Sequence, residues 1–406
     1  MKIAVTRLTA ALLGSAIAVP ALAEEVEVVH WLTAGAESAA IQVLVDGVEA
    51  RGTTWIDLAT PGGGSDARAL FSSRLAGGDP VGALFMSIGP EAIELGEQGV
   101  VRDVEGFAQE NDLIASVPDF ALDIARGSDG ELFALPVALE TQNFMWYSLP
   151  AFEAAGIEPA TTWQGLIDAA PALKEAGIIP LAMGAQGWQI DILFTAVIAS
   201  VAGPEKYLAI YRDRDADAAA SDDVLEAFRI MRALSELQDE GSSNRAWNDT
   251  LNLVAQDKAA VQVMGSWAGA ELASMGETYG TDWGCALAGG GGAIVGSTGF
   301  AFPVLSENEG GQNDFILTLM DPAVQTAFSV QKGSIPARTD ASTEGLSECA
   351  VVAAESVAAG NGMPNVSAVL NPDSRGQIND MMANFWSNPS MSPEDAAKTF
   401  ASLIGG

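Results

Sequence analysis

Apolar residues in the first part of the chain follow two periodicities in turn. Short runs rich in valine, leucine and aromatic residues have the length of buried strands and lie at 26–31, 55–59 and 83–87. Between them, Ile41, Leu44 and Val48 fall on one face of a helix, and a second helical segment spans 67–76. This alternation of strand and helix predicts a parallel sheet covered by helices, an α/β fold.

The turns that follow these strands are the first places to look for function. In such sheets, ligands bind in the crevice beyond the carboxyl ends of the strands. The turns after Trp31, Ala59 and Ser87 are therefore expected to face one crevice. The second turn is rich in glycine, and either Ser65 or Asp66 is expected to cap the next helix while facing that crevice.

The segment from Gly130 to Ser148 interrupts this alternation. An apolar stretch through Pro136 passes into the polar residues 140–143, which we interpret as the first crossing between two lobes. Beyond it, strands are predicted at 178–183 and 260–264, and helices at 162–175, 190–201, 222–238 and from 267 onward. These elements form a second α/β lobe, and the glycine-rich segment 289–299 is expected to carry the chain back to the first.

The first 23 residues have the composition of a secretory signal peptide. Lys2 and Arg7 precede an apolar run at 8–19, and Ala21 and Ala23 frame a cleavage site after Ala23. The run is shorter than the roughly 20 residues that span a bilayer, and we expect no comparable run later in the chain. No cysteine follows the cleavage site to accept a lipid, so the sequence predicts a soluble protein free in the periplasm.

Length and charge restrict the fold and the partners. Cleavage removes 23 of the 406 residues, and the remainder is too long for one core of roughly 100 to 200 residues, so two lobes are expected. The full chain carries a formal net charge of −34, which the loss of Lys2 and Arg7 makes still more negative. Such a charge repels nucleic acids and anionic membrane surfaces, so we expect neither as a partner.

Cys285 and Cys349 are the two cysteines of the chain. In an oxidising compartment such a pair usually forms a disulfide, and we predict one here, with two buried free thiols as the alternative. Closing so long a loop is expected to stabilise the fold by roughly 4 kcal/mol through the entropy of the unfolded chain.

Signatures of catalysis and of cofactor binding are sparse. His30 is the only histidine, which excludes sites that need several histidines, and its place at a strand end suggests a structural role. No Gly-x-Ser-x-Gly sequence is present. Residues 62–67 fit a G-x-G-x-x-A dinucleotide loop, but they follow the second strand rather than the first, so we expect no cofactor and no metal. Paired carboxylates for glycoside hydrolysis cannot be recognised without their separation in space.

Four tryptophans give the strongest indication of a ligand. Trp31, Trp188, Trp247 and Trp267 lie near expected strand ends or at the starts of helices. A flat indole face suits the C–H face of a sugar ring, while nearby carboxylates, amides and hydroxyls satisfy the sugar hydroxyls. Each tryptophan alone is more often a core residue, but together at the carboxyl edge of a sheet they favour a carbohydrate site.

Five segments, in this order along the chain, resemble the extracellular solute-binding proteins (family 1) of carbohydrate ABC importers, and among them the glucose- and mannose-binding branch. They are residues 30–40 (HWLTAGAESAA), 74–80 (RLAGGDP), 143–147 (NFMWY), 263–268 (VMGSWA) and 332–338 (KGSIPAR). The resemblance implies a two-lobed periplasmic binding protein of the Venus-flytrap type II fold, without enzymatic activity. It also implies a monomer that closes on a small carbohydrate and delivers it to an inner-membrane ABC permease.

The resemblance further implies where the lobes begin and end. Hinge crossings are expected near Pro136–Glu140, Gly296–Phe300 and Ser334–Arg338. With 1–23 as the signal peptide, the N-terminal lobe comprises 24–137 and 297–335, and the C-terminal lobe comprises 138–296 and 336–406.

The sugar-binding residues of the family match this chain only in part. Residues that stack on the sugar or bond its hydroxyls in glucose-binding relatives are matched by Trp31, Glu37, Asn143 and Trp267. Other positions of that pattern carry different residues: Leu32, Phe85, Ser87, Thr298 and Asn361. Each hydroxyl left unpaired would cost about 1 to 3 kcal/mol, which favours another monosaccharide, a sugar derivative or a disaccharide over glucose. The remaining candidate binding residues are Ser65, Asp66, Glu140, Trp188 and Trp247.

Two other functions stay open. A receptor for a non-sugar osmolyte or polyol would share the fold, and the ligands that stabilise the protein against heat would distinguish it. A secreted glycoside-active enzyme is the alternative from another class, and it would turn over a chromogenic glycoside.

Overall fold

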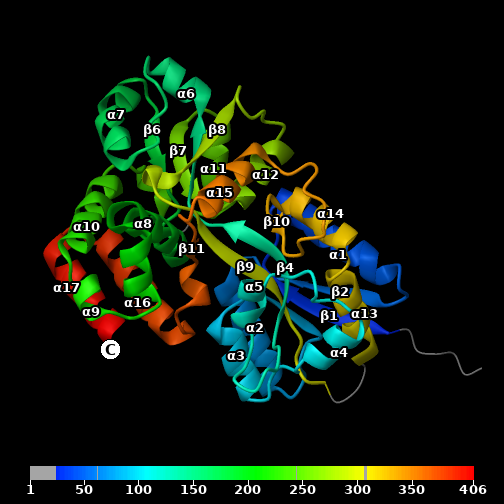
Figure 1. Ribbon diagram of the computed structural model, residues 1–406. Coiled ribbons are helices and arrows are strands. Elements are labelled where there is room, and N and C mark those ends of the chain that lie inside the picture. The colour runs from blue at the N-terminus through cyan, green and yellow to red at the C-terminus, as the bar shows by residue number, and fades with distance from the viewer. Residues whose placement is uncertain (1–23, 62, 244, 306–308) are drawn as a thin grey trace, which may run out of the picture.

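The computed structural model describes residues 24–61, 63–243, 245–305 and 309–406, and the predicted signal peptide at 1–23 lies outside this part of the chain. The described chain forms two α/β lobes, each built on its own sheet, which meet along the middle of the molecule (Figure 1). The predicted two-lobed α/β fold is confirmed.

The N-terminal lobe is built on a mixed sheet with the strand order β10-β4-β9-β3-β1-β2, to which β11 is added beside β9. Its strands are β1 Glu25–His30, β2 Thr54–Ala59, β3 Ala83–Ser87, β4 Leu135–Thr141, β9 Ile294–Ala301, β10 Ile335–Pro336 and β11 Met363–Pro364. The first three are parallel, as predicted, whereas β9 runs antiparallel to both β3 and β4. The glycine-rich segment 289–299, expected to carry the chain back to the first lobe, thus contains most of strand β9.

Helices cover both faces of this sheet. They are α1 Gly35–Glu49, α2 Gly64–Ala76, α3 Pro90–Glu97, α4 Glu105–Glu110, α5 Asp119–Asp123, α13 Glu309–Leu319 and α14 Pro322–Lys332. The alternating side chains of β1 separate two cores, because Val28 joins Leu44 of α1 and Phe315 of α13 on one face, whereas Val29 joins Phe71 of α2 on the other. The predicted helices at 41–48 and 67–76 are α1 and α2.

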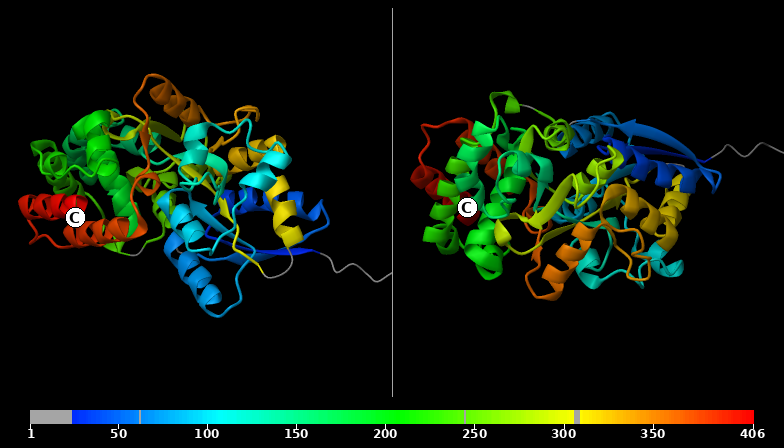
Figure 2. Two further views of the ribbon diagram at one scale, coloured as in Figure 1. Left: turned by 60° about the horizontal axis from the view of Figure 1, so that its bottom comes forward. Right: turned by 90° about the horizontal axis from the view of Figure 1, so that it is seen from above.

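The C-terminal lobe has a smaller sheet with the order β6-β7-β5-β8. Its strands are β5 Phe144–Ser148, β6 Ile179–Ala182, β7 Ala259–Met264 and β8 Trp283–Leu287. Its helices are α6 Leu149–Ala154, α7 Trp163–Glu175, α8 Gly187–Tyr211, α9 Ala216–Ala219, α10 Asp222–Ser235, α11 Trp247–Ala255, α12 Trp267–Ser274, α15 Glu348–Ala358, α16 Pro372–Ser387 and α17 Pro393–Gly405. Helices α16 and α17 end the chain and pack beside α8 and α10, which precede them by more than a hundred residues (Figure 2).

Helix α8 has the length and apolar composition of a membrane span, contrary to the expectation that no such run follows the signal peptide. Its apolar residues from Ile190 to Ala199 are buried in the core of the C-terminal lobe, and it packs against α10 and α16. Gly203, with a φ of 75°, and Pro204 interrupt its course. A helix that is buried by its neighbours and broken in this way is the core helix of a lobe.

The three segments expected to cross between the lobes lie side by side. Strand β4 pairs with β9 on one side and with β10 on the other, so one sheet holds all three connections. The expected boundaries after 137, 296 and 335 fall inside these strands. The division into lobes at those positions stays a prediction.

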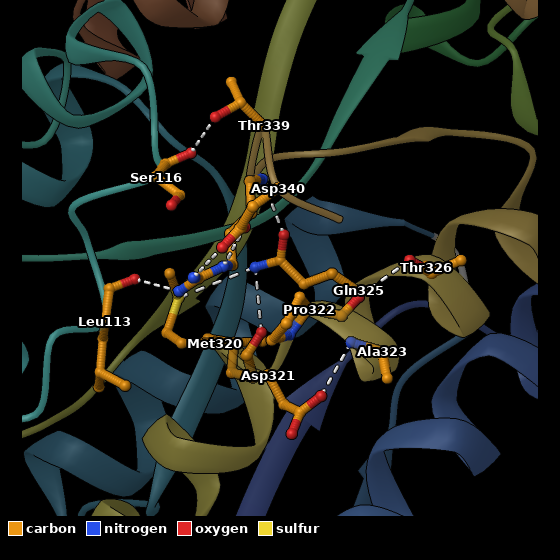
Figure 3. Close-up of polar contacts among 12 residues, drawn as sticks. Leu113, Ser116, Met320, Asp321, Pro322, Ala323, Gln325, Thr326, Thr339 and Asp340 are labelled. Carbon is orange, nitrogen blue, oxygen red and sulfur yellow. Dashed lines mark hydrogen bonds and ion pairs between the residues drawn. The ribbon is translucent and has the colours of Figure 1, made fainter. Parts of the chain in front are cut away.

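Residues just after β10 remain attached to the N-terminal lobe. The Arg338 guanidinium donates to the Leu113 carbonyl at 2.6 Å. The hydroxyl of Thr339 donates to the Ser116 carbonyl at 3.0 Å (Figure 3). The backbone N–H of Thr339 donates to the same carbonyl. We therefore infer that the third crossing lies a few residues later than Arg338.

A disulfide joins Cys285 of β8 to Cys349 of α15, which confirms the predicted bridge. Strand β8 is at the edge of the smaller sheet, and the bridge fixes α15 beside it. The cysteines are 64 positions apart, and the chain between them contains β9, α13, α14 and β10. The closed loop thus leaves the C-terminal lobe, passes through the N-terminal lobe and returns.

Candidate functional site

A cavity of about 450 Å³ lies between the two lobes. The turns after β1 and β2 and the end of β3 form one wall, as predicted for the carboxyl edge of the larger sheet. The first turns of α8, α11 and α12, with the segment from β11 to α16, form the opposite wall. Strands β4 and β9 and the end of α14 contribute residues between these walls. The volume lies within the range of small-molecule sites.

Most of the predicted binding residues line this cavity. They are Trp31, Glu37, Ser65, Ser87, Glu140, Trp188, Trp247, Trp267 and Thr298. Phe85 and Leu32, which replace polar or aromatic residues of the family pattern, also face it. Residues from both lobes and from the connecting strands are therefore brought together as expected for an interlobe site.

Three predicted residues do not line the cavity: Asp66, Asn143 and Asn361. Asn143 is fully buried, where its amide donates to the Gly292 carbonyl at 2.9 Å and accepts from the Ile294 N–H at 2.8 Å. Its hydrogen-bonding groups are used to hold the entry of β9, so we do not retain it as a ligand contact. Asp66 and Asn361 have exposed side chains outside the cavity.

Aromatic rings face the cavity from both walls. In the N-terminal lobe, Trp31 packs on Phe85 with 4.7 Å between ring centroids. In the C-terminal lobe, Trp247 and Trp267 meet edge to face at 6.4 Å. Trp31 and Trp247 are only partly buried, so apolar ring surface is left for a ligand.

A buried ion cluster joins these walls. The ammonium of Lys332, at the end of α14, lies 2.9 Å from Glu140 Oε1 and 3.4 Å from Glu37 Oε1. It also lies 4.7 Å from the centroid of the Trp267 ring. The second oxygen of Glu37 accepts from the backbone N–H groups of Thr33 and Ala34 at the start of α1. The cluster therefore connects α1, β4 and α14 with the start of α12.

Burial shapes the protonation of this cluster. Burial raises the pKa of Glu37, against the attraction of Lys332 and the hydrogen bonds from Ala34 and Thr33. Burial alone would lower the pKa of Lys332, but Glu140 and Glu37 together outweigh it, and its pKa is raised. The lysine therefore keeps its charge, and both of its nearby carboxylates are used in holding it.

A second group of charges spans the cleft, and sequence reasoning missed it. Arg68 of α2 donates to Glu91 of α3 at 2.7 Å, and Arg375 of α16 reaches the other Glu91 oxygen at 3.9 Å from the opposite lobe. Asp191 of α8 lies on the same cavity. As the one acidic residue in an apolar run, Asp191 carried a signal in the sequence. Arg375 carried none, because its helix was not predicted.

The two lobes touch at several points around the cavity. Gly63, with a φ of 92°, lets its turn approach the Trp188 ring of the other lobe, and a Cβ atom there would lie 3.7 Å from Trp188 Nε1. Glu271 of α12 accepts from the backbone N–H groups of Gly35 and Ala36, at 3.3 and 2.8 Å, and so caps α1 from the opposite lobe. These contacts place the lobes close together over the cavity.

His30 lies outside the cavity-lining residues. Its Nε2 is 2.6 Å from an oxygen of Asp57 on the neighbouring strand, and the ring is buried. Burial lowers the pKa of His30, against the opposing effect of Asp57. These contacts indicate a structural role for His30 within the sheet.

The family model for bacterial extracellular solute-binding proteins matches residues 48–325, which is more than half of the chain. The chain belongs to this family. It is therefore a binding receptor rather than an enzyme, and it acts outside the cytoplasm, in the periplasm or the extracellular space.

Two relatives that match over most of the chain agree with this family. A probable sugar-binding periplasmic protein of Rhizobium meliloti (strain 1021) is 34% identical over 392 residues, covering 96% of this chain and 91% of the relative. A protein of the same description from Brucella melitensis biotype 1 is 32% identical over 370 residues, covering 90% of this chain and 84% of the relative.

Two solved structures illustrate the shared fold. A chitin oligosaccharide binding protein superposes with a TM-score of 0.78 at 18% identity, over 94% of this chain and 98% of its own. A maltose-bound protein of T. maritima superposes with a TM-score of 0.74 at 17% identity, over 94% and 98% respectively. At these identities the similarity shows the shared two-lobed fold.

Proposed function

We propose that this solute-binding protein is the periplasmic receptor of a carbohydrate ABC importer. The chain enters the periplasm by a cleaved signal peptide, stays soluble without a lipid anchor, and works as a monomer. It binds a small carbohydrate in the interlobe cavity, and an inner-membrane permease takes the ligand from the closed form. No cofactor or metal takes part.

The observation that carries this proposal is the set of indole rings on both walls of one cavity that also contains hydroxyl-binding groups. Trp31 on one wall and Trp247 and Trp267 on the other suit the two faces of a sugar ring. Ser87 and Thr298 add hydroxyl groups at the sheet edge. The probable sugar-binding function of the two relatives supports the same ligand class.

Charge pairing in the cavity favours a neutral sugar over a sugar acid. Lys332 is held by Glu37 and Glu140, and Arg68 is held by Glu91. A carboxylate or phosphate on the ligand would have to displace one of these protein carboxylates, which leaves an unpaired charge in a buried site. A neutral ligand disturbs neither pair.

A thermal-shift screen of the mature protein tests the proposal. The panel comprises D-glucose, D-mannose, D-galactose, maltose, sorbitol, myo-inositol and D-glucuronate. A neutral sugar at 100 times its dissociation constant is expected to stabilise the folded state by about 2.7 kcal/mol, and glucuronate is expected to have no effect. Stabilisation by polyols alone would identify an osmolyte receptor, and no stabilisation by any compound would contradict the proposal.

Replacing Trp267 by alanine tests the aromatic wall. Loss of ring contact with the sugar is expected to weaken binding roughly tenfold or more while the fold is kept, measured by titration calorimetry with the best sugar of the screen. Tyr279→Ala is the matched control, because this exposed ring lies in the same lobe outside the cavity. Equal affinity of Trp267→Ala and the control would remove Trp267 from the site.

A further inference from the structure

Asp191 presents to the cavity a carboxylate that accepts no hydrogen bond from the described residues. It lies near the start of α8 between Ile190 and Ile192, which are buried apolar residues. Among the residues that the structure describes, none hydrogen-bonds or ion-pairs with either of its carboxylate oxygens. Its side chain is partly exposed at the cavity wall, so these acceptor oxygens are open to a hydrogen-bond donor of a bound ligand.

The other acidic side chains around the cavity differ from Asp191. Glu37 and Glu140 hold Lys332, and Glu91 holds Arg68. Asp249 is exposed at the start of α11 and is therefore already solvated. Within the described part of the cavity, Asp191 is the acidic group that combines a sheltered position with unused acceptor oxygens.

We propose that Asp191 is the group through which the C-terminal lobe recognises the bound carbohydrate, by accepting hydrogen bonds from two neighbouring hydroxyl groups. This assignment rests on the proposed carbohydrate function. The two oxygens of one carboxylate are spaced to meet adjacent hydroxyls, and hydrogen bonds to a charged acceptor are roughly twice as strong as neutral ones. Sugars that lack such a hydroxyl pair at this position would bind weakly.

The surroundings of Asp191 make this recognition sensitive to protons. Burial raises its pKa to about 6, against the attraction of Arg375 on α16. Tyr207 and Tyr211 share its helix, and since burial raises the pKa of both well above the usual value, they stay neutral in this range. Helices α9 and α10 and strand β7 also pack on α8, and their described residues place no charge that acts on Asp191.

The sign of the pH effect follows from the acceptor role. A protonated Asp191 loses one acceptor oxygen, so the ligand prefers the ionised form, and binding releases a proton when the free protein is protonated. Affinity is therefore expected to be level above about pH 7 and to fall below pH 6, by at most about tenfold per pH unit. Burial also raises the pKa of Glu37, a second acid on the cavity wall, against the attraction of Lys332.

Titration calorimetry of the full mature protein at pH 5.0, 6.0 and 7.5 tests the proposal. The probe is whichever of D-glucose, D-mannose, D-galactose and maltose stabilises the wild type most. The wild type is expected to bind several-fold more weakly at pH 5.0 than at pH 7.5. Asp191→Asn is expected to bind at least roughly tenfold more weakly than wild type at pH 7.5 and with little further change at pH 5.0.

Glu205→Gln is the matched control, since it removes an exposed acid from the same helix outside the cavity. It is expected to match the wild type at every pH. Monodeoxy forms of the probe separate direct contact from a structural effect. A deoxy sugar that lacks a hydroxyl bound by Asp191 should bind the wild type much more weakly than the probe does. Its affinity for Asp191→Asn should differ little from that of the probe. Asp191→Ser provides a second variant in case the amide disturbs the fold.

Each contrary result is distinct. Wild-type affinity in Asp191→Asn, or equal losses for every deoxy sugar in both proteins, would overturn the role of Asp191. A weakened variant that keeps the wild-type pH profile would also overturn it, because another group would then cause the pH dependence. Failure of the wild type to bind any sugar of the panel would instead overturn the proposed function.

Discussion

At the scale of the residue, the cavity keeps most of its charges paired within the protein. Lys332 is shared by two glutamates, and Glu91 is shared by arginines of opposite lobes. Burial removes the solvation of such pairs, and their mutual attraction offsets this loss of free energy only when the geometry is good. They are therefore better suited to fixing the shape of a site than to stabilising the folded protein. Asp191 is the exception, and its stability cost is a consequence of its proposed role.

The ligand-free protein is expected to become more stable when Asp191 is replaced by asparagine. Folding raises the pKa of Asp191 from 3.8 to about 6, so this group favours the folded state at acid pH and ceases to do so as pH rises through that window. The cost of keeping it ionised at pH 7.5 is up to about 3 kcal/mol. Melting curves of both proteins at pH 4.5 and 7.5 check this.

The gain in melting temperature from Asp191→Asn should be larger at pH 7.5 than at pH 4.5. Glu205→Gln again serves as the control, and its difference from wild type should be small at both values. An equal gain at both pH values would mean that the ionised carboxylate is solvated in the folded protein.

Much of the cavity wall could be predicted from the residue types at strand ends. Residues whose role depends on partners far away in the sequence could not be predicted in this way. The four tryptophans follow from local pattern, and all four line the cavity. Asn143 shows the limit of that reasoning, because its amide is used by a backbone segment about 150 positions away. No local pattern reveals whether a polar side chain will find its partners inside the protein.

At the scale of the element, helix α1 depends on a residue of the other lobe. Its N-cap residue, Ala34, has no side chain able to cap the first turn. Glu271 of α12 supplies the missing acceptor for Gly35 and Ala36. Because the helix dipole favours a negative charge at this end, the contact couples the order of α1 to the closeness of the lobes.

Glu271→Ala is expected to loosen the contact between the lobes. Loss of the cap should cost about 1 to 2 kcal/mol, and it should shift the ligand-free protein toward a more open form. Small-angle scattering should show a larger radius of gyration. Each 1 kcal/mol lost from the closed form should weaken sugar binding about fivefold.

Asp321→Ala is the matched control for this experiment. Asp321 also accepts from two backbone N–H groups at the start of a helix, but within one lobe. They are those of Ala323 (Figure 3) and Val324 in the first turn of α14. It should lower the melting temperature without changing the radius of gyration. If Glu271→Ala leaves both the radius of gyration and the sugar affinity unchanged, Glu271 caps α1 without affecting how close the lobes lie.

Elements with strong periodicity were predicted, and elements without it were not. Short apolar runs bounded by turns predicted strands β1, β2, β3, β6 and β7. Helical segments between them predicted α1, α2, α7 and α10. Strand β9 was obscured by its glycines, which permit close approach to neighbouring backbone, as at Gly299 against the Leu135 carbonyl. Whether such a glycine-rich segment forms a strand depends on the strands beside it rather than on its own composition.

At the scale of the whole molecule, the disulfide stabilises a chain path that visits both lobes. The loop that it closes passes through β9, α13, α14 and β10, so the unfolded chain loses freedom over a long segment. Neither cysteine lines the cavity. The bridge is therefore expected to affect the unfolded state much more than the ligand site.

The double variant Cys285→Ser/Cys349→Ser is expected to lose up to about 4 kcal/mol of stability while keeping sugar affinity within about twofold. Wild type treated with a reductant should match it in melting temperature and affinity, because both lack the same cross-link. Titration calorimetry and thermal melts of the two samples provide the comparison. A large loss of affinity in both would show that α15 must be held against β8 for the lobes to close. The bridge would then act on the folded state, through the short connection from Thr339 to α15 that joins the two lobes.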